Sequence, residues 1–561
     1  MGRQRAAATL AVLLALTLCW GAGGQGCVPP AWVAEVECVE GAKTVDCAFC
    51  GGAGIAAPNS TCAPAPGPGA DSRAGRLAIL VLGSVAACAL SVAIGGNNAG
   101  EAWGSAVGSG AIGIRAGCLL GGLGELLGSA LLGTGVSGTL QEFVVEPGGE
   151  GCWACGLCTS KMGTHELGML AALCGAVVYL MGATLLGMPV SSTHVVVAGV
   201  VGMTWSSVGS GCLNWSPLEG GLGSIALSWV VSPILAGISG MAMYVSTHFL
   251  IFKSGDPVKA AFVAVPCMYG ITSAMLLYLT LLISPMTATS FKWGPRMLVS
   301  IATLFTVPFV VNRSVMPHVK LEVSYARKVY EAKARAHEAE EVGRVTGALR
   351  ASQHLGDCPA RPAREDPCQR EAQRPADGER GLRLFAPSAP TVEQALAKCC
   401  FKRLLVFNAF LESFAIGAND TANATGPFGA IYGAYNSGVY ACDLEPTPWW
   451  VMLIAGLFVF VGVNTFGHRV IRTVGEGLCS LDYHVGYCVE WASASAVFAA
   501  TLMHLPVSTT CCQISAVVCV GVAAAGLEGV SWRMLSRIAL TWAATLPCAG
   551  LLAALLTKLY S

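Results

Sequence analysis

Residues 417–427 read GANDTANATGP and follow directly on an apolar run from Leu404 to Ile416. An Asp flanked by two Asn is unexpected there, because each unpaired polar group costs several kcal/mol inside a membrane. The run is one of many: of the 561 residues, 54% are hydrophobic and 12% are charged, and the mean hydropathy is +0.61. One soluble core cannot bury that much apolar surface, so the composition predicts an all-α polytopic membrane protein without a nucleic-acid partner.

The motif at 417–427 has an echo in the first half of the chain, IGGNNAGEAWGSAVGSG at 94–110. A second pair of motifs matches more closely, GMPVSSTHVVVAGVVG at 187–202 and HLPVSTTCCQISAVVCVG at 504–521. In each copy the Gly/Asn-rich motif comes first, and the Pro-Val-Ser motif follows about 90 residues later. Two ordered pairs of this kind indicate an internal duplication.

Apolar runs of spanning length predict about twelve transmembrane segments. Seven precede a hydrophilic block, at 76–95, 111–137, 166–188, 190–207, 222–248, 257–284 and 294–312, and five follow it, at 401–417, 448–466, 487–504, 506–527 and 533–557. Each copy then has five spans, with two intervening spans between the copies. Because seven spans separate the two starts, the copies must cross the membrane in opposite directions. Inverted-topology repeats with broken helices are typical of secondary transporters, whose sites lie near the midplane.

The hydrophilic block at 313–400 separates two transmembrane halves, 76–312 (first repeat about 76–248) and 401–561. Between Arg313 and Arg403 there are 17 Lys or Arg and 12 Asp or Glu. Seven crossings from an outside start place this basic excess in the cytoplasm, where it belongs. We expect the charged stretch from Val319 to Ser352 to prolong the seventh span as a solvated helix, and residues 358–381 to remain unfolded in a cytoplasmic linker.

Residues 1–25 have the order of a signal peptide, with basic Arg3 and Arg5 before an apolar core and small residues after it; an uncleaved anchor helix is the alternative. Residues 26–75 are then an extracellular or luminal Cys-rich segment and linker, with a glycosylation acceptor at Asn59. We expect the protein to lie in the plasma membrane. The cysteines on its outer side should then form disulfides, and a zinc site with His165 as the fourth ligand is the less favoured alternative. The disulfide candidates are Cys27, Cys38, Cys47, Cys50, Cys62, Cys152, Cys155 and Cys158, and Cys212 and Cys442 lie in outer loops beside them.

Hydroxyl side chains follow Pro189 and Pro506, which occupy positions typical of a first helical turn. Helix N-termini near the midplane attract anions, so the candidate anion ligands are Ser191, Ser192, Thr193, Ser508, Thr509 and Thr510. The Gly/Asn motifs supply carbonyl and carboxylate oxygens, which suit a small cation, and the candidates there are Asn97, Asn98, Glu101, Asn419, Asp420 and Asn423. Neither motif contains Lys or Arg, so a buried oxyanion would need bound cations to offset its charge, as in a symporter.

Four stretches together resemble the inorganic phosphate transporter (PiT) family, the type III sodium/phosphate symporters. They are FAIGANDTANATGPFGAIYGAY, HRVIRTVGEGL, YCVEWASASAVFAATLMHLPVSTT and GSAVGSGAIGIRAGCLLGGLGELLGSALLGTGVSGTL. The resemblance covers about 76–248 and 401–557. It implies import of inorganic phosphate with co-transported Na+ or H+ and no cofactor, and no span carries a catalytic constellation that would indicate an enzyme.

The resemblance also implies roles for single residues. Copy two matches the family signature at Asn419, Asp420 and Asn423 and its second motif at Ser508, Thr509 and Thr510. Glu490 falls on a carboxylate that the family has in the span before that motif, and Glu125 resembles its counterpart in copy one.

Copy one departs from the family pattern at two positions. Asn98 stands where the family has Asp and Glu101 where it has Asn, so the carboxylate has moved by about one helical turn. Copy two has Cys511 where copy one, at His194, and the family have His. These departures leave both Na+ and H+ open as the coupled ion.

Two other functions remain open at this point. One is a permease for another tetrahedral oxyanion, such as sulfate or arsenate, and the other is a membrane phosphate sensor or receptor that does not transport. A homodimer is a further hypothesis about partners, besides the lipid bilayer.

The predicted topology makes the first test. If copy one starts outside and copy two inside, Asn59 should be glycosylated, and residues 353–398 should be cleaved by a protease added only from the cytoplasmic side. Glycosidase shifts and protease protection in sealed vesicles measure both. Finding both segments on the same side of the membrane would break the inverted-repeat argument.

Overall fold

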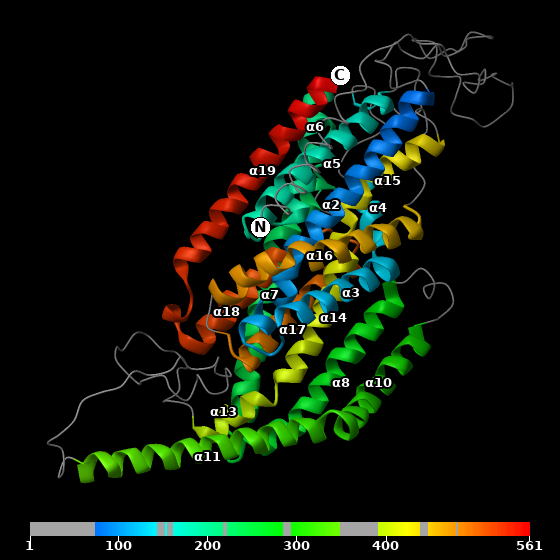
Figure 1. Ribbon diagram of the computed structural model, residues 1–561. Coiled ribbons are helices and arrows are strands. Elements are labelled where there is room, and N and C mark those ends of the chain that lie inside the picture. The colour runs from blue at the N-terminus through cyan, green and yellow to red at the C-terminus, as the bar shows by residue number, and fades with distance from the viewer. Residues whose placement is uncertain are drawn as a thin grey trace, which may run out of the picture.

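In the computed structural model, the described residues form a bundle of helices (Figure 1). The described residues are 73–142, 152–153, 161–216, 221–283, 293–347, 391–437, 447–477 and 481–560. Within these ranges there is no strand. The signal peptide, Asn59 and the cysteines at 27, 38, 47, 50, 62, 155 and 158 lie outside the described residues.

Nine helices in the described ranges are long and apolar enough to cross a membrane. They are α2 (Arg73–Gly108), α3 (Ile114–Leu132), α5 (Met162–Leu185), α7 (Leu222–Thr247), α8 (Pro257–Ile283), α10 (Trp293–Ser314), α16 (Trp449–Gly477), α17 (Tyr483–Leu502) and α19 (Trp532–Tyr560). Their outer faces are apolar; on α10, for example, Leu298, Phe305 and Phe309 are 69–71% exposed. Large apolar side chains in such numbers need lipid around them, which confirms the prediction of a multi-span, all-α membrane protein.

The other three predicted spans coincide with helices that are shorter or more polar, namely α6 (Ser192–Ser207), α14 (Lys402–Asp420) and α18 (Thr509–Ala525). Helices α6 and α18 begin directly after the two Pro-Val-Ser sequences, with Ser191 and Ser508 as N-caps. The expectation that Pro189 and Pro506 lie in the first helical turn is therefore wrong, because both prolines precede the caps. The expected break within the Gly/Asn motif occurs only in copy two, where Thr421 separates α14 from α15 (Ala422–Ser437). In copy one the expectation of a break is wrong, because α2 continues through the motif to Gly108.

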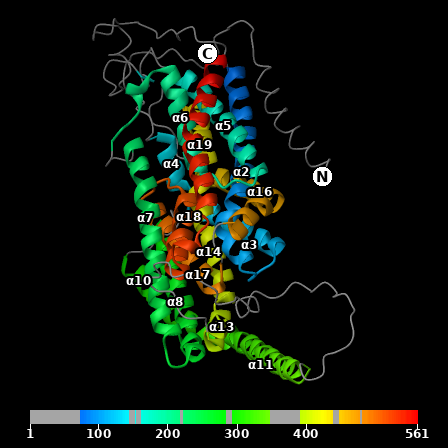
Figure 2. The same cartoon turned by 90° about the vertical axis from the view of Figure 1, so that its left-hand side faces the viewer.

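The last helix of each copy packs against the other copy. Helix α7, which ends copy one, lies against α17 and α18 of copy two, whereas α19, which ends copy two, lies against α5 and α6 of copy one. Figures 1 and 2 show α19 running alongside α5 and α6 from both directions. The two copies are therefore interleaved, and neither half forms the bundle without the other.

Glycines bring the first helix of copy one into backbone contact with α16. A Cβ atom on Gly95 would lie 2.1 Å from the carbonyl oxygen of Val459, and one on Gly108 would lie 2.3 Å from that of Gly475. Only glycine fits at such an approach. The same device at Gly417, where a Cβ would lie 2.1 Å from the Glu125 carbonyl oxygen, holds α14 against α3.

The charged helix α11 (Met316–Gly347) does not prolong the seventh span, so that expectation is wrong. The chain turns at Val315, and α11 crosses the end of the bundle at a steep angle to α10 (Figure 1). Its first turns bury Met316, Val319 and Val323 in the core, which a straight continuation of α10 would leave in solvent. The apolar stripe on α11 thus decides its direction.

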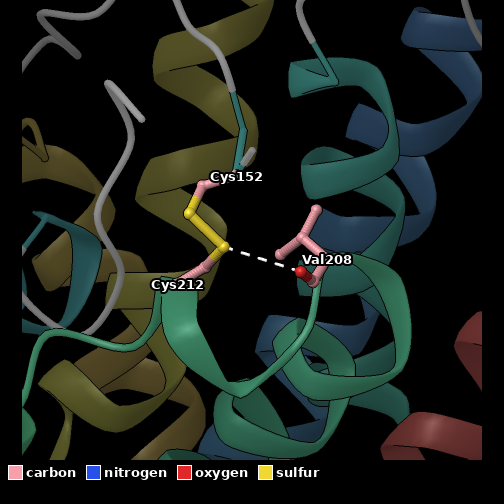
Figure 3. Close-up of a disulfide and its surroundings, with 3 residues drawn as sticks. All are labelled: Cys152, Val208 and Cys212. Atoms are coloured by element: carbon pink, nitrogen blue, oxygen red, sulfur yellow. Dashed lines mark hydrogen bonds between the residues drawn. A yellow bond between two sulfur atoms is a disulfide. The ribbon is translucent and has the colours of Figure 1, made fainter. Parts of the chain in front are cut away.

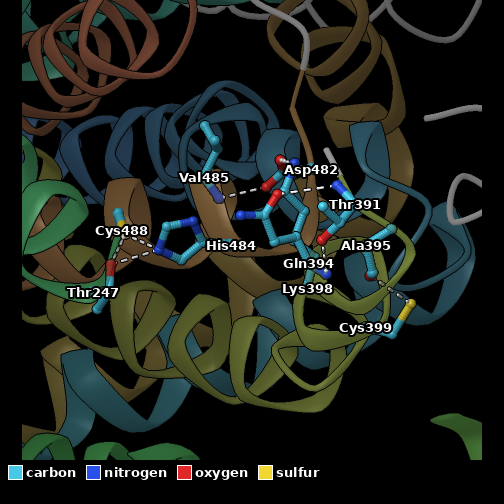
Figure 4. A network of polar contacts seen from close by, with 10 residues as sticks. All are labelled: Thr247, Thr391, Gln394, Ala395, Lys398, Cys399, Asp482, His484, Val485 and Cys488. Atoms are coloured by element: carbon cyan, nitrogen blue, oxygen red, sulfur yellow. Dashed lines mark hydrogen bonds and ion pairs between the residues drawn. The ribbon is translucent and has the colours of Figure 1, made fainter. Parts of the chain in front are cut away.

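The end of the hydrophilic block is tied to the bundle by α13 (Val392–Cys399) (Figure 4). Lys398 Nζ lies 2.8 Å from Asp482 Oδ2, and Asp482 Oδ1 accepts a 2.7 Å hydrogen bond from the Val485 N–H, which caps α17. Burial alone would raise the pKa of the Asp482 carboxyl, but the attraction of Lys398 and the hydrogen bonds lower it. Gln394 Nε2 donates to the Phe252 carbonyl oxygen at 3.0 Å. The end of the hydrophilic block is therefore held against the start of α17 by the ion pair between Lys398 and Asp482.

A disulfide joins Cys152 to Cys212, across 60 residues of sequence (Figure 3). It links the segment before α5 to the turn after α6 and confirms the disulfide prediction for Cys152. In the sequence analysis His165 is the fourth ligand of an alternative zinc site. In the structure it packs edge-on against Trp153, with ring centroids 4.8 Å apart.

Replacing both cysteines of this disulfide with Ser should lower the thermal unfolding temperature, because the unfolded chain gains the freedom of a long loop, worth about 4 kcal/mol in the chain-entropy account. A thermal melt of the detergent-solubilised protein measures it. Cys548→Ser, at an exposed thiol on α19, is the matched control. Equal melting temperatures for the double variant and the parent would contradict the prediction.

Candidate functional site

Two asparagines make the same set of contacts in the two copies. Asn97 Nδ2 donates to Thr184 Oγ1 at 3.1 Å and to the Met188 carbonyl oxygen at 3.0 Å, and Asn97 Oδ1 accepts from the Val190 N–H at 3.0 Å. Each Asn thus ties its Gly/Asn motif to the chain just before a Pro-Val-Ser helix. In copy two, Asn419 Nδ2 donates to Thr501 Oγ1 at 3.3 Å and to the Leu505 carbonyl oxygen at 3.1 Å. Asn419 Oδ1 accepts from the Val507 N–H at 3.3 Å.

This matched geometry gives Asn97 and Asn419 a positioning role that the sequence analysis did not assign to them. From the sequence, both residues are expected to be cation ligands. Their amide groups are instead engaged with the backbone on either side of Pro189 and Pro506, so they fix where α6 and α18 begin.

The first turns of α6 and α18 meet inside the bundle. Ser191 Oγ accepts from the His194 N–H and Ser508 Oγ from the Cys511 N–H, each at 3.2 Å, so these two hydroxyls are N-caps. Thr193 Oγ1 donates to the Val507 carbonyl oxygen at 2.8 Å, and Thr510 Oγ1 donates to the Val190 carbonyl oxygen at 3.3 Å. Each helix start is therefore held by a threonine from the other copy, and both N-termini face one region.

Asp420 lies at the meeting point of the two helix starts. Its Oδ2 accepts from Ser192 Oγ at 3.1 Å and from Thr509 Oγ1 at 2.8 Å, one hydroxyl from each copy. Asn423 Nδ2 donates to Ser192 Oγ at 3.0 Å and to Thr193 Oγ1 at 3.1 Å. Residues predicted separately for an anion and for a cation thus form a single site.

Five carboxylates in this part of the bundle are at most 1% exposed, and Glu101 and Glu125 are the ones that face Asp420: Glu101, Glu125, Glu412, Asp420 and Glu490. Glu101 accepts from Thr510 Oγ1 of the other copy. Glu490 accepts from Ser105 Oγ and, at 3.2 Å, from Gln513 Nε2, which also donates to the Glu101 carbonyl oxygen at 2.7 Å. Asp420 and Glu101 are electrostatic neighbours of Glu125.

This group of carboxylates has no basic partner within the described part of the chain. Arg76 is the only buried Lys or Arg side chain in that part of the chain. Its Nε atom lies 3.6 Å from Oε1 of Glu166. The groups that Asp420 and Glu125 face among the described residues are neutral hydroxyls, an amide and other carboxyls. Buried charge must be compensated, so these carboxyl groups require either protonation or a positive charge from outside the described chain.

The departures in copy one fall within this site. Asn98 is fully buried, and its side chain lies against the carboxyl groups of Asp420 and Glu125. The carboxylate displaced to Glu101 faces Thr510, whereas Asp420 faces Ser192 and Thr509. His194 packs edge-on against Trp229 at 4.1 Å between ring centroids, and Cys511 is buried.

Sequence reasoning missed two polar residues of this region and misjudged one correspondence. Glu412 interrupts a run that was read as apolar, and Gln513 follows the second Pro-Val-Ser motif; a check for polar residues inside spans would find both. Glu125 is not the positional counterpart of Glu490, because Glu490 lies on α17, directly before the second motif, whereas Glu125 lies on α3, two spanning helices from the first. Both carboxylates nevertheless belong to one group.

Comparisons with known proteins agree with this architecture. The model of the phosphate transporter family matches residues 94–553. A protein of Pyrococcus abyssi named as a phosphate permease is 27% identical, covering 86% of this chain and 97% of its own length. The sodium-dependent phosphate transporter 2 of Bos taurus is 25% identical, covering 82% and 94%. A solved sodium-dependent phosphate transporter superposes with a TM-score of 0.65 at 26% identity, covering 86% of this chain and 98% of that one.

The interleaved bundle and its central polar site define a membrane transporter and not an enzyme. The chain belongs to the phosphate transporter family.

Asp420→Asn tests what Asp420 does at the meeting point. Asn keeps an acceptor for Ser192 and Thr509 but removes the charge, so a merely structural Asp420 predicts near-normal transport. If Asp420 ligates a coupled cation, uptake of labelled phosphate should collapse while the variant still reaches the membrane, because the ligand has lost its charge. Asp256→Asn, at an exposed helix start, is the matched control. Parent-like uptake and cation dependence in Asp420→Asn would assign the cation role elsewhere.

Proposed function

We propose that the protein imports inorganic phosphate by symport with cations, Na+ or H+, and binds the anion between the starts of α6 and α18. One observation carries the proposal: two helix N-termini meet at Asp420, among buried carboxylates without a basic partner in the described ranges. Membership of the phosphate transporter family identifies phosphate as the anion. The buried carboxylates of this chain are the reason to propose a coupled cation.

The anion side of the proposal rests on four hydroxyls and the first-turn N–H groups. Ser192 and Thr509 donate to Asp420, and an entering phosphate would take over these donors together with the backbone N–H groups of both first turns. Thr193 and Thr510 stand one residue further on each helix. Two facing N-termini give the anion twice the favourable dipole of one.

The cation side rests on the oxygen ligands around the same point. Asp420, Glu101 and Asn423 contact the hydroxyls of the anion site, so a cation bound to them would lie next to the phosphate. We assign supporting roles to Asn98, Glu125 and Glu490, which lie around this group. Binding of either ion then favours binding of the other, because each removes an uncompensated charge.

Coupling to cations also answers the energetics of import. Each negative charge brought into a cell with an inside-negative potential costs about 2.3 kcal/mol per 100 mV. A divalent phosphate therefore needs at least two cations for electroneutral entry, and more for uptake driven by the potential. Several buried carboxylates give the chain enough positions for them.

We further propose that the two copies are inverted-topology repeats in the plasma membrane. The exchange of Thr193 and Thr510 hydrogen bonds, the paired roles of Asn97 and Asn419, and the crossed packing of α7 and α19 are the relations expected of two units joined by a pseudo-two-fold axis. A site on such an axis is equally related to both sides of the membrane, which is what alternating access requires.

Uptake of radiolabelled phosphate in a host that lacks its own transporters tests the function. We expect uptake that depends on Na+, on acid pH outside, or on both, and that unlabelled phosphate suppresses more than sulfate does. Suppression mainly by sulfate would favour a different oxyanion. Phosphate binding without uptake would favour a sensor.

In the same assay, Ser192→Ala and Thr509→Ala should each raise the phosphate concentration for half-maximal uptake by about 5- to 100-fold, since each removes one donor to a dehydrated oxyanion. Ser206→Ala, at the far end of α6, is the matched control because its hydroxyl bonds only to the Met203 carbonyl oxygen, at 3.0 Å. Unchanged kinetics in both site variants, at equal surface expression, would remove these hydroxyls from the anion site.

A further inference from the structure

Helix α3 carries a lipid-facing apolar stripe that ends in a basic residue. Its leucines recur at every fourth position and are each 39–49% exposed: Leu119, Leu123, Leu127 and Leu131. Arg115, four residues before Leu119, continues the same face of the helix and is also exposed. It is the second residue of α3, an apolar helix of spanning length. The stripe therefore ends in positive charge where the hydrocarbon layer gives way to lipid headgroups.

Helix α16 has the same pattern in the opposite chain direction. Its outward apolar side chains are 38–47% exposed: Ile454, Leu457, Phe458 and Val461. The same face continues at helical spacing through Thr465 and His468 to Arg472, which is exposed. The stripe of α3 is thus basic at its N-terminal end, and that of α16 is basic at its C-terminal end.

The two stripes lie on neighbouring helices, because α3 and α16 pack side by side (Figures 1 and 2). A Cβ atom on Gly122 would lie 2.7 Å from the Phe460 ring, whereas one on Gly467 would lie 3.9 Å from the Cys118 sulfur. Earlier residues of α3 therefore meet later residues of α16, so the two helices are antiparallel.

This antiparallel register brings the two basic ends together. Arg115 lies three residues before Cys118, and Arg472 lies five residues after Gly467, so both arginines extend beyond that contact in the same direction. Neither side chain forms an ion pair or a hydrogen bond with any residue that the structure describes. By contrast, Arg469 is engaged inside the bundle, since its Nη1 donates to the Leu185 carbonyl oxygen at 2.7 Å.

Uncompensated positive charge beside a lipid-facing apolar surface suits an anionic phospholipid. Acyl chains fit along the exposed apolar stripes, and the planar guanidinium group binds a phosphate through two parallel hydrogen bonds. In the predicted topology the first span enters from outside, so this end of α3 lies on the cytoplasmic side. The cytoplasmic leaflet is the one that carries anionic lipids.

We propose that Arg115 and Arg472 form a site for the headgroup phosphate of an anionic phospholipid, whose acyl chains lie along the exposed stripes of α3 and α16. The site is on the outer surface of the bundle, apart from the helix starts of α6 and α18. A headgroup held there fixes the depth of the α3–α16 pair in the bilayer. Free inorganic phosphate shares this chemistry, so the test must separate the two sources.

The experiment measures lipid binding to the purified full-length protein in detergent, titrated with phosphatidylglycerol or with phosphatidylcholine. Both lipids carry a headgroup phosphate, but only phosphatidylglycerol has a net negative charge. We expect phosphatidylglycerol to bind more tightly. Arg115→Gln and Arg472→Gln should each weaken its binding about 5-fold, and the double variant about 30-fold, because each removes one positive charge at the membrane surface. Arg115→Lys with Arg472→Lys should retain most of the affinity.

Two exposed arginines near the start of α19 provide the matched control. Arg533→Gln combined with Arg537→Gln removes the same charge from another spanning helix, and we expect it to bind phosphatidylglycerol as the parent does. An equal loss of affinity in the control pair would show that binding follows net charge alone, and it would overturn a defined site. Parent-like affinity in the Arg115/Arg472 double variant would overturn it as well.

Thermal melts separate the lipid from free phosphate without any transport measurement. Phosphatidylglycerol should raise the melting temperature of the parent more than that of the Arg115/Arg472 double variant, since a ligand that binds only the folded state stabilises it. Inorganic phosphate should shift both proteins equally, because its proposed site lies elsewhere. A double variant that loses the inorganic phosphate shift but keeps the phosphatidylglycerol shift would show that these arginines bind the free anion, and the lipid site would be wrong.

Discussion

Two helices begin in the middle of this bundle, and the rest of the site depends on satisfying their first turns away from water. An N-terminus leaves backbone N–H groups without acceptors, and it carries a partial positive charge. Ser191 and Ser508 cap one N–H group of each helix, while the side-chain oxygens of Asn97 and Asn419 accept from the N–H groups of the residues that follow the prolines. What remains is a buried pair of helix N-termini with partial positive charge, and Asp420 lies between them.

The same constraint explains why the two copies are interleaved. A single copy could not shield its own helix start, because the acceptors for Thr193 and Thr510 are carbonyl oxygens of the opposite copy. Packing of α7 on α17 and α18, and of α19 on α5 and α6, closes the bundle around both starts. The two copies differ in charge at one matching position, because copy one has Asn98 where copy two has Asp420. Glu101 gives copy one a carboxylate about one helical turn away.

Much of this arrangement was predictable because the duplication marks it in the sequence. The repeated Pro-Val-Ser and Gly/Asn motifs indicated Ser192, Thr509 and Asp420 before any contact was known, and apolar run lengths located the helices. The direction of α11, the continuity of α2 through its motif, and the unrelated positions of Glu125 and Glu490 were not predictable. They follow from tertiary packing: Val319 and Val323 bury against the bundle, and Gly95 and Gly108 hold α2 straight along α16. Likewise, one cysteine of the disulfide was predicted, but its partner depended on where α6 ends.

The glycine contacts of α2 have a consequence for movement. Gly95 and Gly108 are separated by about 20 Å of helix, and at both points the backbones of α2 and α16 touch without side chains between them. Two rods fastened at two well-separated points cannot hinge or slide against each other without breaking both contacts. Helices α2 and α16 therefore act as one rigid unit. In the proposed transport cycle we expect the short helices to move relative to this unit.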